Sequence, residues 1–200
     1  MPARLSERTS LLSRLVRSAV LALYRWKGWR FETGAGVPRR CVIVGAPHTS
    51  NWDFVFFLGA TDELGVHARF MGKRSLFRWP LRRFMFDMGG IPVDRSKSGN
   101  YVEDVAAEFA CSSDLALVVA PEGTRGTITR WRSGFYHIAM EAGVPIVPAW
   151  VDHATMRGGL GPAIVLTGDF AADLKVIALF YRSVMPDHPK LAVLCAQAGI

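Results

Sequence analysis

Cysteine is scarce in this chain of 200 residues, where Cys41, Cys111 and Cys195 stand far apart. An odd and widely spaced set of this kind is typical of reduced thiols in a cytosolic setting, and it argues against a disulfide framework or a zinc site. The chain also lacks any run of about 18 uncharged apolar residues, the length that a membrane-spanning helix needs. Residues 18–24 are apolar, but the large and charged residues at 25–27 stand where a signal peptide has its cleavage site, so we expect no signal peptide.

Several common catalytic signatures are missing as well. No Gly-x-Ser-x-Gly elbow is present, which argues against the usual serine hydrolase arrangement. The Gly-Lys-Ser/Thr ending of a phosphate-binding P-loop is absent, and residues 158–161 match no dinucleotide-binding fingerprint, so we interpret them as a turn. We expect no metal and no cofactor. Four histidines lack the spacing of metal ligands, and we interpret them as surface or packed residues: His67, His137, His153 and His188.

The composition indicates one packed domain with an uneven charge distribution. Apolar residues make up 50% of the chain, with twelve Phe and six Trp, which argues against disorder. The net charge of +7 lies entirely in residues 1–40, because acidic and basic side chains are equal in number over the rest. The chain therefore divides into a basic arm, residues 1–40, and a neutral body, residues 41–200.

The arm contains a segment with helical periodicity that ends near Gly28. Arg14, Arg17 and Arg25 fall outside its apolar positions, so the segment predicts a basic amphipathic helix. Such a helix lies in a lipid interface or packs its apolar stripe on its own domain. Aromatic residues gather with cations at positions 24–29, which favours the lipid interface. The apolar positions are Leu12, Leu15, Val16, Ala19, Val20, Leu23 and Trp26.

In the body, short apolar runs alternate with segments of helical periodicity. Near-continuous apolar strands that alternate with helices predict an α/β fold, with a mostly parallel sheet covered by helices on both faces. The predicted strands are 41–46, 67–71, 91–93, 115–120, 144–151 and 163–167, and the predicted helices are 51–64, 75–87, 101–111, 133–142 and 171–183.

Residues 48–53, with the sequence His-Thr-Ser-Asn-Trp-Asp, directly follow the apolar run 41–46. Positions five apart on one helix point about 140° apart, so His48 and Asp53 can meet only if the histidine precedes the helix. The Ser-x-x-Asp form of residues 50–53 is typical of a helix N-terminus and favours that arrangement. A carboxylate that fixes one imidazole nitrogen leaves the other free to abstract a proton, so the pair predicts a general base. In the alternative, Asp53 only caps the helix.

Residues 121–126, with the sequence Pro-Glu-Gly-Thr-Arg-Gly, follow the strand predicted at 115–120. The two glycines permit close backbone approach, Thr124 offers a hydroxyl, and Arg125 offers a planar fork suited to phosphate. The motif predicts an anion site, and an ordinary turn with a Glu122–Arg125 surface pair is the alternative. Parallel strands present ligands at their carboxyl ends, where this motif and the first one would both lie.

A third motif, residues 89–96, again places an arginine, Arg95, just past a short apolar strand. Residues 73–84 interleave cations with aromatic side chains. Such a pattern suits a lipid surface, a phosphorylated cofactor or nucleic acid, and a solvated helix face is the alternative for each charge.

Taken in this order, the motifs resemble those of the glycerolipid acyltransferases, specifically the 1-acylglycerol-3-phosphate O-acyltransferase (lysophosphatidate acyltransferase) family. The resemblance covers about residues 41–151 through four blocks: 48–53, 90–95, 121–125 and 144–148. It implies transfer of an acyl group from a coenzyme A or acyl-carrier-protein thioester to a lysophospholipid hydroxyl. The expected reaction converts 1-acyl-glycerol-3-phosphate to phosphatidate in phospholipid biosynthesis.

The resemblance also implies roles for individual residues. His48 deprotonates the acceptor hydroxyl, and Asp53 orients His48. The other residues that it places in contact with substrate are Lys73, Arg95 and Arg125 at the acceptor phosphate, Glu122, Gly123 and Thr124 around the acceptor pocket, and Pro148 in the block on the acyl side.

The implied partners are a lysophospholipid acceptor, an acyl-CoA or acyl-carrier-protein donor, and an anionic membrane surface, with no nucleic acid. We expect the protein in the cytoplasm, with the arm bound peripherally to the cytoplasmic face of the membrane. Two alternatives stay open. One is acylation of another acceptor, such as glycerol-3-phosphate or a lyso-aminolipid. The other is a non-catalytic basic module that binds membrane or nucleic acid, which would leave the spacing of His48 and Asp53 unexplained.

Overall fold

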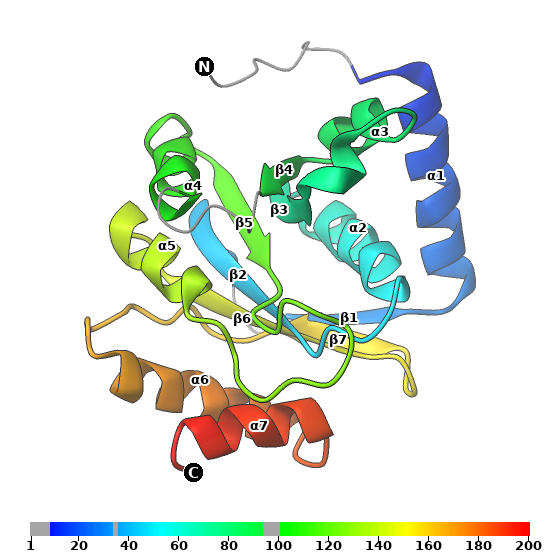
Figure 1. Ribbon diagram of the computed structural model, residues 1–200. Coiled ribbons are helices and arrows are strands. Elements are labelled where there is room, and N and C mark those ends of the chain that lie inside the picture. Colours follow the sequence, from blue (N-terminus) through cyan, green and yellow to red (C-terminus); the bar gives the residue numbers. More distant parts are fainter. Residues whose placement is uncertain (1–8, 34–35, 94–100) are drawn as a thin grey trace.

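The computed structural model describes residues 9–33, 36–93 and 101–200 and has a seven-stranded sheet at its centre (Figure 1). The strand order is β1-β7-β6-β2-β5-β3-β4, and every neighbouring pair is parallel except β6 and β7. The predicted mostly parallel sheet is therefore confirmed. The strands are β1 (Arg30–Thr33), β2 (Arg40–Ala46), β3 (Ala68–Lys73), β4 (Gly90–Val93), β5 (Leu115–Val119), β6 (Ile146–Asp152) and β7 (Arg157–Leu160).

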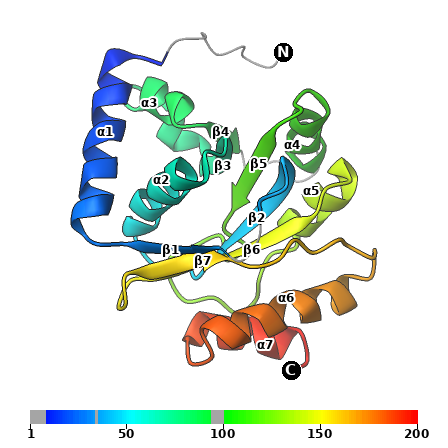
Figure 2. The ribbon, with the colours of Figure 1, turned by 180° about the vertical axis from the view of Figure 1, so that it is seen from behind.

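Helices cover both faces of the sheet, as the alternating pattern predicts (Figures 1 and 2). Helices α4 to α7 pack on one face around the larger core cluster, while α2 covers the other face and α1 packs on the outside of α2. The helices are α1 (Leu11–Trp26), α2 (Trp52–Leu64), α3 (Arg82–Asp87), α4 (Tyr101–Ala110), α5 (Gly134–Ala142), α6 (Phe170–Val184) and α7 (Pro189–Gln197), with the 3-10 helix η1 (Arg74–Phe77).

Strand β2 is buried on both faces, which explains its unbroken apolar sequence. Val42 and Val44 belong to the core cluster beneath α4 to α7, whereas Cys41 and Ile43 belong to the cluster on the opposite face. A strand covered on both sides gains from apolar residues at every position rather than at alternate ones. This central strand fixes the position of the loop that follows Ala46.

The helix predicted over residues 75–87 is wrong, because the segment is divided into η1 and α3. Pro80 lies between the two pieces, and a proline inside a helix removes a backbone donor and clashes with the preceding turn. The neighbouring Trp79 is 90% exposed. The basic and aromatic residues of 73–84 therefore lie on a bent surface segment rather than along one helix.

The strand predicted at 163–167 is also wrong. Within that range only Ile164 pairs, through an isolated bridge to Ile146, and the regular strand of this region is β7. The turn predicted at 158–161 is therefore mostly strand. Its glycines concealed it, because glycine has a low preference for strands and carries no side chain that could reveal the alternation of a sheet.

The sequence pattern predicts neither β1 nor α7. Edge strand β1 shows that the sheet extends into residues 1–40, the segment assigned to the arm. The close approach of β1 and α2 to β7 depends on glycine. A Cβ at Gly159 would lie 2.3 Å from the carbonyl oxygen of Glu32, and one at Gly158 would lie 2.4 Å from the ring of Phe56. Larger residues here would force these elements apart.

Helix α1 is amphipathic, as predicted, and it packs on α2 through one face only. Its N-cap is Ser10, whose side chain accepts a hydrogen bond from the backbone N–H of Ser13. Arg17 and Arg25 both form ion pairs with Asp62 of α2. The helix is therefore attached to the body along its length, and the alternative in which it packs on its own domain is correct for this face.

The opposite face of α1 carries an apolar stripe that nothing in the described residues covers. Leu11, Leu12, Leu15 and Trp26 are 72%, 71%, 68% and 77% exposed. The aromatic residues expected together at a lipid interface are divided, however. Tyr24 and Trp29 are buried in the cluster around Phe56, and only Trp26 is exposed. No helix among the described residues has both the length and the apolar character to cross a membrane.

Candidate active site

The predicted motifs follow neighbouring strands and meet at one edge of the sheet. His48 follows β2, the loop 121–126 follows β5, and Lys73 ends β3. In Figure 1 the loops after β2 and β5 come together at the lower edge of the sheet, beside α7. Because parallel strands end at the same edge, the order of the strands brings these side chains into one region.

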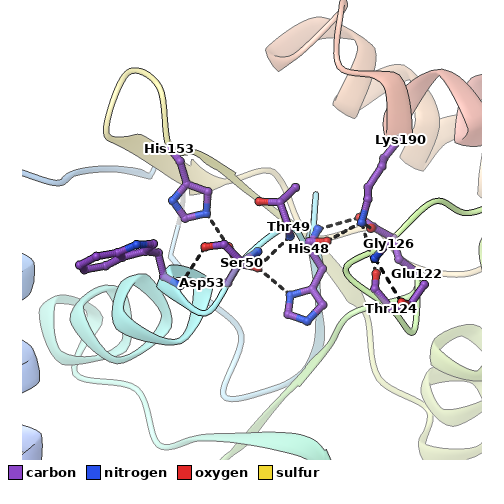
Figure 3. Close-up of polar contacts among 10 residues, drawn as sticks. His48, Thr49, Ser50, Asp53, Glu122, Thr124, Gly126, His153 and Lys190 are labelled. Atoms are coloured by element: carbon purple, nitrogen blue, oxygen red, sulfur yellow. Dashed lines mark hydrogen bonds and ion pairs between the residues drawn. The ribbon is translucent and has the colours of Figure 1, made fainter.

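His48 and Asp53 form a direct pair (Figure 3). Helix α2 begins at Trp52, so Asp53 lies in its first turn and His48 lies on the preceding loop, as the sequence predicts. The Nδ1 atom of His48 is 2.7 Å from Oδ2 of Asp53. A carboxylate accepts, so the neutral imidazole carries its proton on Nδ1 and presents an unprotonated Nε2.

The same carboxylate also fixes the loop that precedes α2, whose N-cap residue, Asn51, makes no side-chain cap hydrogen bond. The Oδ2 atom of Asp53 accepts hydrogen bonds from the backbone N–H groups of Thr49, at 2.9 Å, and Ser50, at 3.1 Å. The alternative in which Asp53 only caps the helix is therefore wrong, because Asp53 pairs with His48 and binds the loop before the helix. The positive end of the helix and these N–H groups hold Asp53 in its ionised form.

The second oxygen of Asp53 has a partner that the sequence analysis missed. The Nε2 atom of His153 lies 2.5 Å from Oδ1 of Asp53. Burial alone would raise the pKa of this carboxyl, but the hydrogen bonds from His153, His48 and the Ser50 backbone outweigh burial and hold the pKa of Asp53 well below its usual range. The interpretation of His153 as only a surface or packed residue is therefore incomplete.

Glu122 lies beneath His48 and is fully buried. Its Oε1 atom accepts a hydrogen bond from the backbone N–H of His48, at 2.8 Å, and its Oε2 atom lies 2.5 Å from Nζ of Lys190. Lys190, at the start of α7, also donates to the carbonyl oxygens of His48 and Thr124. Burial raises the pKa of Glu122, and the hydrogen bonds from Lys190 and His48 oppose that rise. This ion pair joins the two motif loops to the C-terminal helix.

A cavity of about 1140 Å³ opens beside the pair. It exceeds the roughly 300–1,000 Å³ of most small-molecule sites. Most of its wall is apolar, and α2, β3 and the segment 76–85 contribute to it together with β2, β5, β6 and α5. Phe54, Phe57 and Phe70 contact one another edge-on or at a tilt within this wall. The cavity therefore combines an imidazole–carboxylate pair with a large apolar lining.

Basic side chains line part of the cavity wall. The residues of the predicted set that line it are His48, Asp53, Lys73, Gly123, Thr124 and Arg125. Arg132, which the sequence analysis did not single out, lines it too. A Cβ at Gly123, whose φ is +68°, would lie 3.0 Å from Nε of Arg132, so glycine permits this arginine to lie over the turn.

Two predicted site residues lie away from the cavity wall, and a third falls outside the described residues. Glu122 does not line the cavity and forms the buried ion pair described above. Pro148 is buried in the middle of β6 and does not line the cavity either. Arg95 lies outside the described residues.

His153, Lys190 and Arg132 are the residues near this site that sequence reasoning missed. His153 is 100 residues from Asp53, and Lys190 is 142 residues from His48, so no local spacing connects them. Of the three, only Arg132 could have been found from the sequence, because it follows the 121–126 motif closely and has a second arginine, Arg130, near it. Within residues 9–33, 36–93 and 101–200, no group of three or more His, Cys, Asp or Glu side chains could hold a metal ion.

Comparison with known proteins agrees with this geometry. The family model described as Acyltransferase matches residues 30–152. The 1-acyl-sn-glycerol-3-phosphate acyltransferase of Limnanthes alba is 29% identical over 123 residues, which are 58% of this chain and 42% of that protein. The 1-acyl-sn-glycerol-3-phosphate acyltransferase beta of Homo sapiens is 31% identical over 157 residues, which are 72% of this chain and 53% of that protein. The chain thus spans about half the length, or less, of these curated relatives.

The fold is also found in a solved structure. The crystal structure of the 1-acyl-sn-glycerophosphate (LPA) acyltransferase PlsC from Thermotoga maritima superimposes with a TM-score of 0.62. The alignment covers 92% of this chain and 85% of that chain, with 14% sequence identity. It therefore includes the elements that flank the family segment.

Proposed function

Because the chain belongs to the Acyltransferase family, we propose that it moves a fatty acyl group from a thioester to the hydroxyl of a lysophospholipid. The proposed acceptor is 1-acylglycerol-3-phosphate and the product phosphatidate. The observation that carries the proposal is the pair of His48 and Asp53, which lines a cavity with a large apolar compartment. Acyl-CoA or acyl-carrier protein would be the co-substrate, and the proposed reaction needs no cofactor.

In the proposed reaction, Nε2 of His48 takes the proton of the acceptor hydroxyl while its oxygen attacks the thioester carbonyl. The tetrahedral intermediate collapses, the carbon–sulfur bond breaks, and the proton passes from His48 to the leaving thiolate. Asp53 keeps the imidazole in the required tautomer and stabilises its protonated form. A thiolate leaves readily, so one base and a correctly placed acceptor suffice, and no protein nucleophile is required.

The apolar part of the cavity supports the binding of an acyl chain, either the one that is transferred from the thioester or the one that the lysolipid already carries. Phe54, Phe57, Phe70 and Phe84 supply an aromatic wall without charged groups. Burying one methylene of a chain against such a wall contributes about 0.8 kcal/mol. A long-chain thioester or lysolipid would therefore bind more tightly than a short one.

Lys73, Arg125 and Arg132 support recognition of the acceptor phosphate, and Arg95 is proposed for the same role. All three described cations line the cavity that contains His48. Arginine can bind two phosphate oxygens at once, whereas lysine acts as a point charge.

Replacement of Arg125 tests the phosphate site. Arg125→Ala should raise the KM of the acceptor by about tenfold to a hundredfold, which corresponds to roughly 1.5–3 kcal/mol for a hydrogen bond to a charged group. The KM of the donor should change little. Arg130→Ala is the matched control, because Arg130 is exposed on the same segment but does not line the cavity. Equal increases in both constants, or an increase for the donor alone, would contradict the assignment.

The exposed stripe of α1 supports peripheral attachment to the cytoplasmic face of a membrane. Leu11, Leu12, Leu15 and Trp26 would enter the interface, while Arg14 is exposed beside them for contact with anionic headgroups. A membrane-bound enzyme would reach a lipid acceptor without extracting it into water.

The pair of substitutions Leu12→Ser and Leu15→Ser tests this attachment. Both side chains are about 70% exposed, so the double variant should fold normally but sediment with anionic vesicles at least tenfold less well. Val176→Ser, on a half-exposed position of α6, is the control. If the double variant and the native protein sediment equally, α1 does not bind the membrane.

Release of donor thiol, measured over a panel of acceptors, tests the proposed function itself. The panel contains 1-acylglycerol-3-phosphate, glycerol-3-phosphate and a lyso-aminolipid, each offered with acyl-CoA and with acyl-carrier protein. Preference for glycerol-3-phosphate or the lyso-aminolipid would establish the acceptor alternative. No thiol release from any combination would exclude acyl transfer and favour a basic binding module.

A further inference from the structure

Both oxygens of the Asp53 carboxylate have hydrogen-bond donors, and the two sides differ in origin. Oδ2 contacts His48 and the backbone N–H groups of Thr49 and Ser50, all within the same loop and helix. Oδ1 contacts a single side chain, His153, from the turn between β6 and β7. Figure 3 shows His153 and His48 on different sides of Asp53. The rotation of the carboxylate is therefore set jointly by its own loop and by a distant histidine.

The ring of His153 is itself held in place. It meets Trp29 edge-on, with 5.2 Å between ring centroids and an interplanar angle of 83°. Trp29 is 6% exposed and packs on Phe56 of α2, the helix that carries Asp53. Because Trp29 fixes one side of the imidazole and the carboxylate occupies Nε2, the ring has little freedom to leave Asp53. Such restraint is typical of a side chain that positions another.

On the basis of the proposed function, we propose that His153 is a positioning residue for acyl transfer, which fixes the orientation and charge of Asp53 and thereby the basicity of His48. Its Nε2–H donates to Oδ1 and disperses negative charge over the carboxylate. A carboxylate that keeps all of its charge stabilises the protonated form of His48 more strongly. Without His153, His48 should hold its proton to higher pH, so less of it is neutral at a given acidic pH, and Asp53 should hold the imidazole less firmly in the orientation that accepts the hydroxyl proton.

Several other charged or titratable groups lie near His48 and His153, and a substitution at position 153 leaves each of them in the protein. Asp152, the last residue of β6, directly precedes His153, and the buried pair of Glu122 and Lys190 lies beneath His48. His188 lies near Asp152 and Lys190. A change in the titration of His48 would therefore report the loss of the contact with Asp53 and not a new neighbour.

Leucine and glutamine at position 153 separate positioning from structural support. His153→Leu removes the donor, whereas His153→Gln places an amide N–H at about the position of the imidazole Nε2. His153→Leu should lower kcat by roughly tenfold or more, with little change in either KM, and move the acidic limb of the pH–rate profile to higher pH. His153→Gln should recover most of the rate and the native profile. His67→Leu, at the amino end of β3, is the matched control.

A titration of the histidine ring resonances gives a readout that does not depend on activity. The signal of His48, assigned by its loss in His48→Gln, should titrate at higher pH in His153→Leu than in the native protein or in His153→Gln. If the native protein releases no thiol but this shift occurs, the contact positions His48 and the proposed reaction is wrong. If thiol release is normal but neither kcat nor the titration changes in His153→Leu, the positioning role is wrong.

Protein stability completes the test. Equal losses of rate in the leucine and glutamine variants, with a lower Tm in both, would assign His153 a structural role only and overturn the proposal. If His153→Leu does not fold, His153→Asn replaces it in the comparison. The asparagine side chain is one methylene shorter than that of glutamine, so its amide should not reach Oδ1 of Asp53. An asparagine variant as active as the glutamine variant would also overturn the proposal.

Discussion

His48→Ala should lose about two to four orders of magnitude in the rate of thiol release, the usual contribution of a general base. The expectation rests on the Nδ1–Asp53 contact of 2.7 Å, which leaves Nε2 as the proton acceptor in the cavity. The variant should fold normally, because the His48 side chain has its polar contact with Asp53, while the backbone contacts of His48 to Glu122 and Lys190 do not require an imidazole.

Thiol release at saturating donor and acceptor measures the effect, and circular dichroism with a thermal scan verifies the fold. His67→Ala serves as the control for loss of an imidazole at the amino end of β3. A well-folded His48→Ala protein with a turnover within threefold of the native value would exclude the mechanism. The acyl-transfer function would then need a different base.

Lys190→Met should lower the free energy of unfolding by about 3–5 kcal/mol, the usual effect of removing one partner of a buried ion pair. The side chains of Lys190 and Glu122 are 11% and 0% exposed, so solvent cannot replace the lost ammonium group. The loops after β2 and β5 would lose their shared attachment to α7. Activity should fall together with stability, because the backbone of His48 is part of this attachment.

Urea unfolding measures the change, with Lys175→Met on the exposed side of α6 as the control. The double variant Lys190→Met, Glu122→Gln should recover part of the loss, because it no longer buries an unpaired charge. If the free energy of unfolding of Lys190→Met lies within 1 kcal/mol of that of the control, the buried ion pair does not stabilise the fold as proposed.

The deficit of Lys190→Met should also depend on pH. Burial raises the pKa of Glu122 in the folded protein, and loss of Lys190 removes a group that opposes the rise. The folded variant therefore binds a proton more tightly than the unfolded chain does, and its stability falls as pH rises from the ordinary glutamate pKa through the raised one. Unfolding near pH 4 should show a smaller deficit than unfolding at pH 7, and an equal deficit at both would contradict the explanation.

The short-range features of the site could be read from the sequence. His48 and Asp53 are five residues apart, and the helix-capping pattern between them left one geometry in which they could meet, which is the one observed. Likewise, apolar runs at 41–46 and 115–120 predicted buried strands, and the rule that parallel strands end at one edge brought the 121–126 loop to His48. Local backbone chemistry and the hydrophobic pattern are sufficient for such features.

Where the pattern was weak, the sequence misled. The segment 75–87 has apolar and basic residues at helical spacing, but Pro80 divides it. The glycines at 158 and 159 suggested a turn, whereas they form part of β7, where β1 and α2 approach too closely for a larger residue. In both places steric fit decided against the average preference of the residues.

By itself, then, the sequence determined an α/β fold with a parallel sheet, an amphipathic first helix, and a histidine–aspartate pair next to a cationic turn. Only the tertiary structure decided what surrounds that pair: His153 on the second oxygen of Asp53, Lys190 under His48, and Arg132 over Gly123. It also decided which face of α1 is buried and which is exposed. The physical reason is that spacing and periodicity encode contacts within a few residues, whereas contacts across 100 or more residues depend on how the strands are ordered and how closely the layers pack.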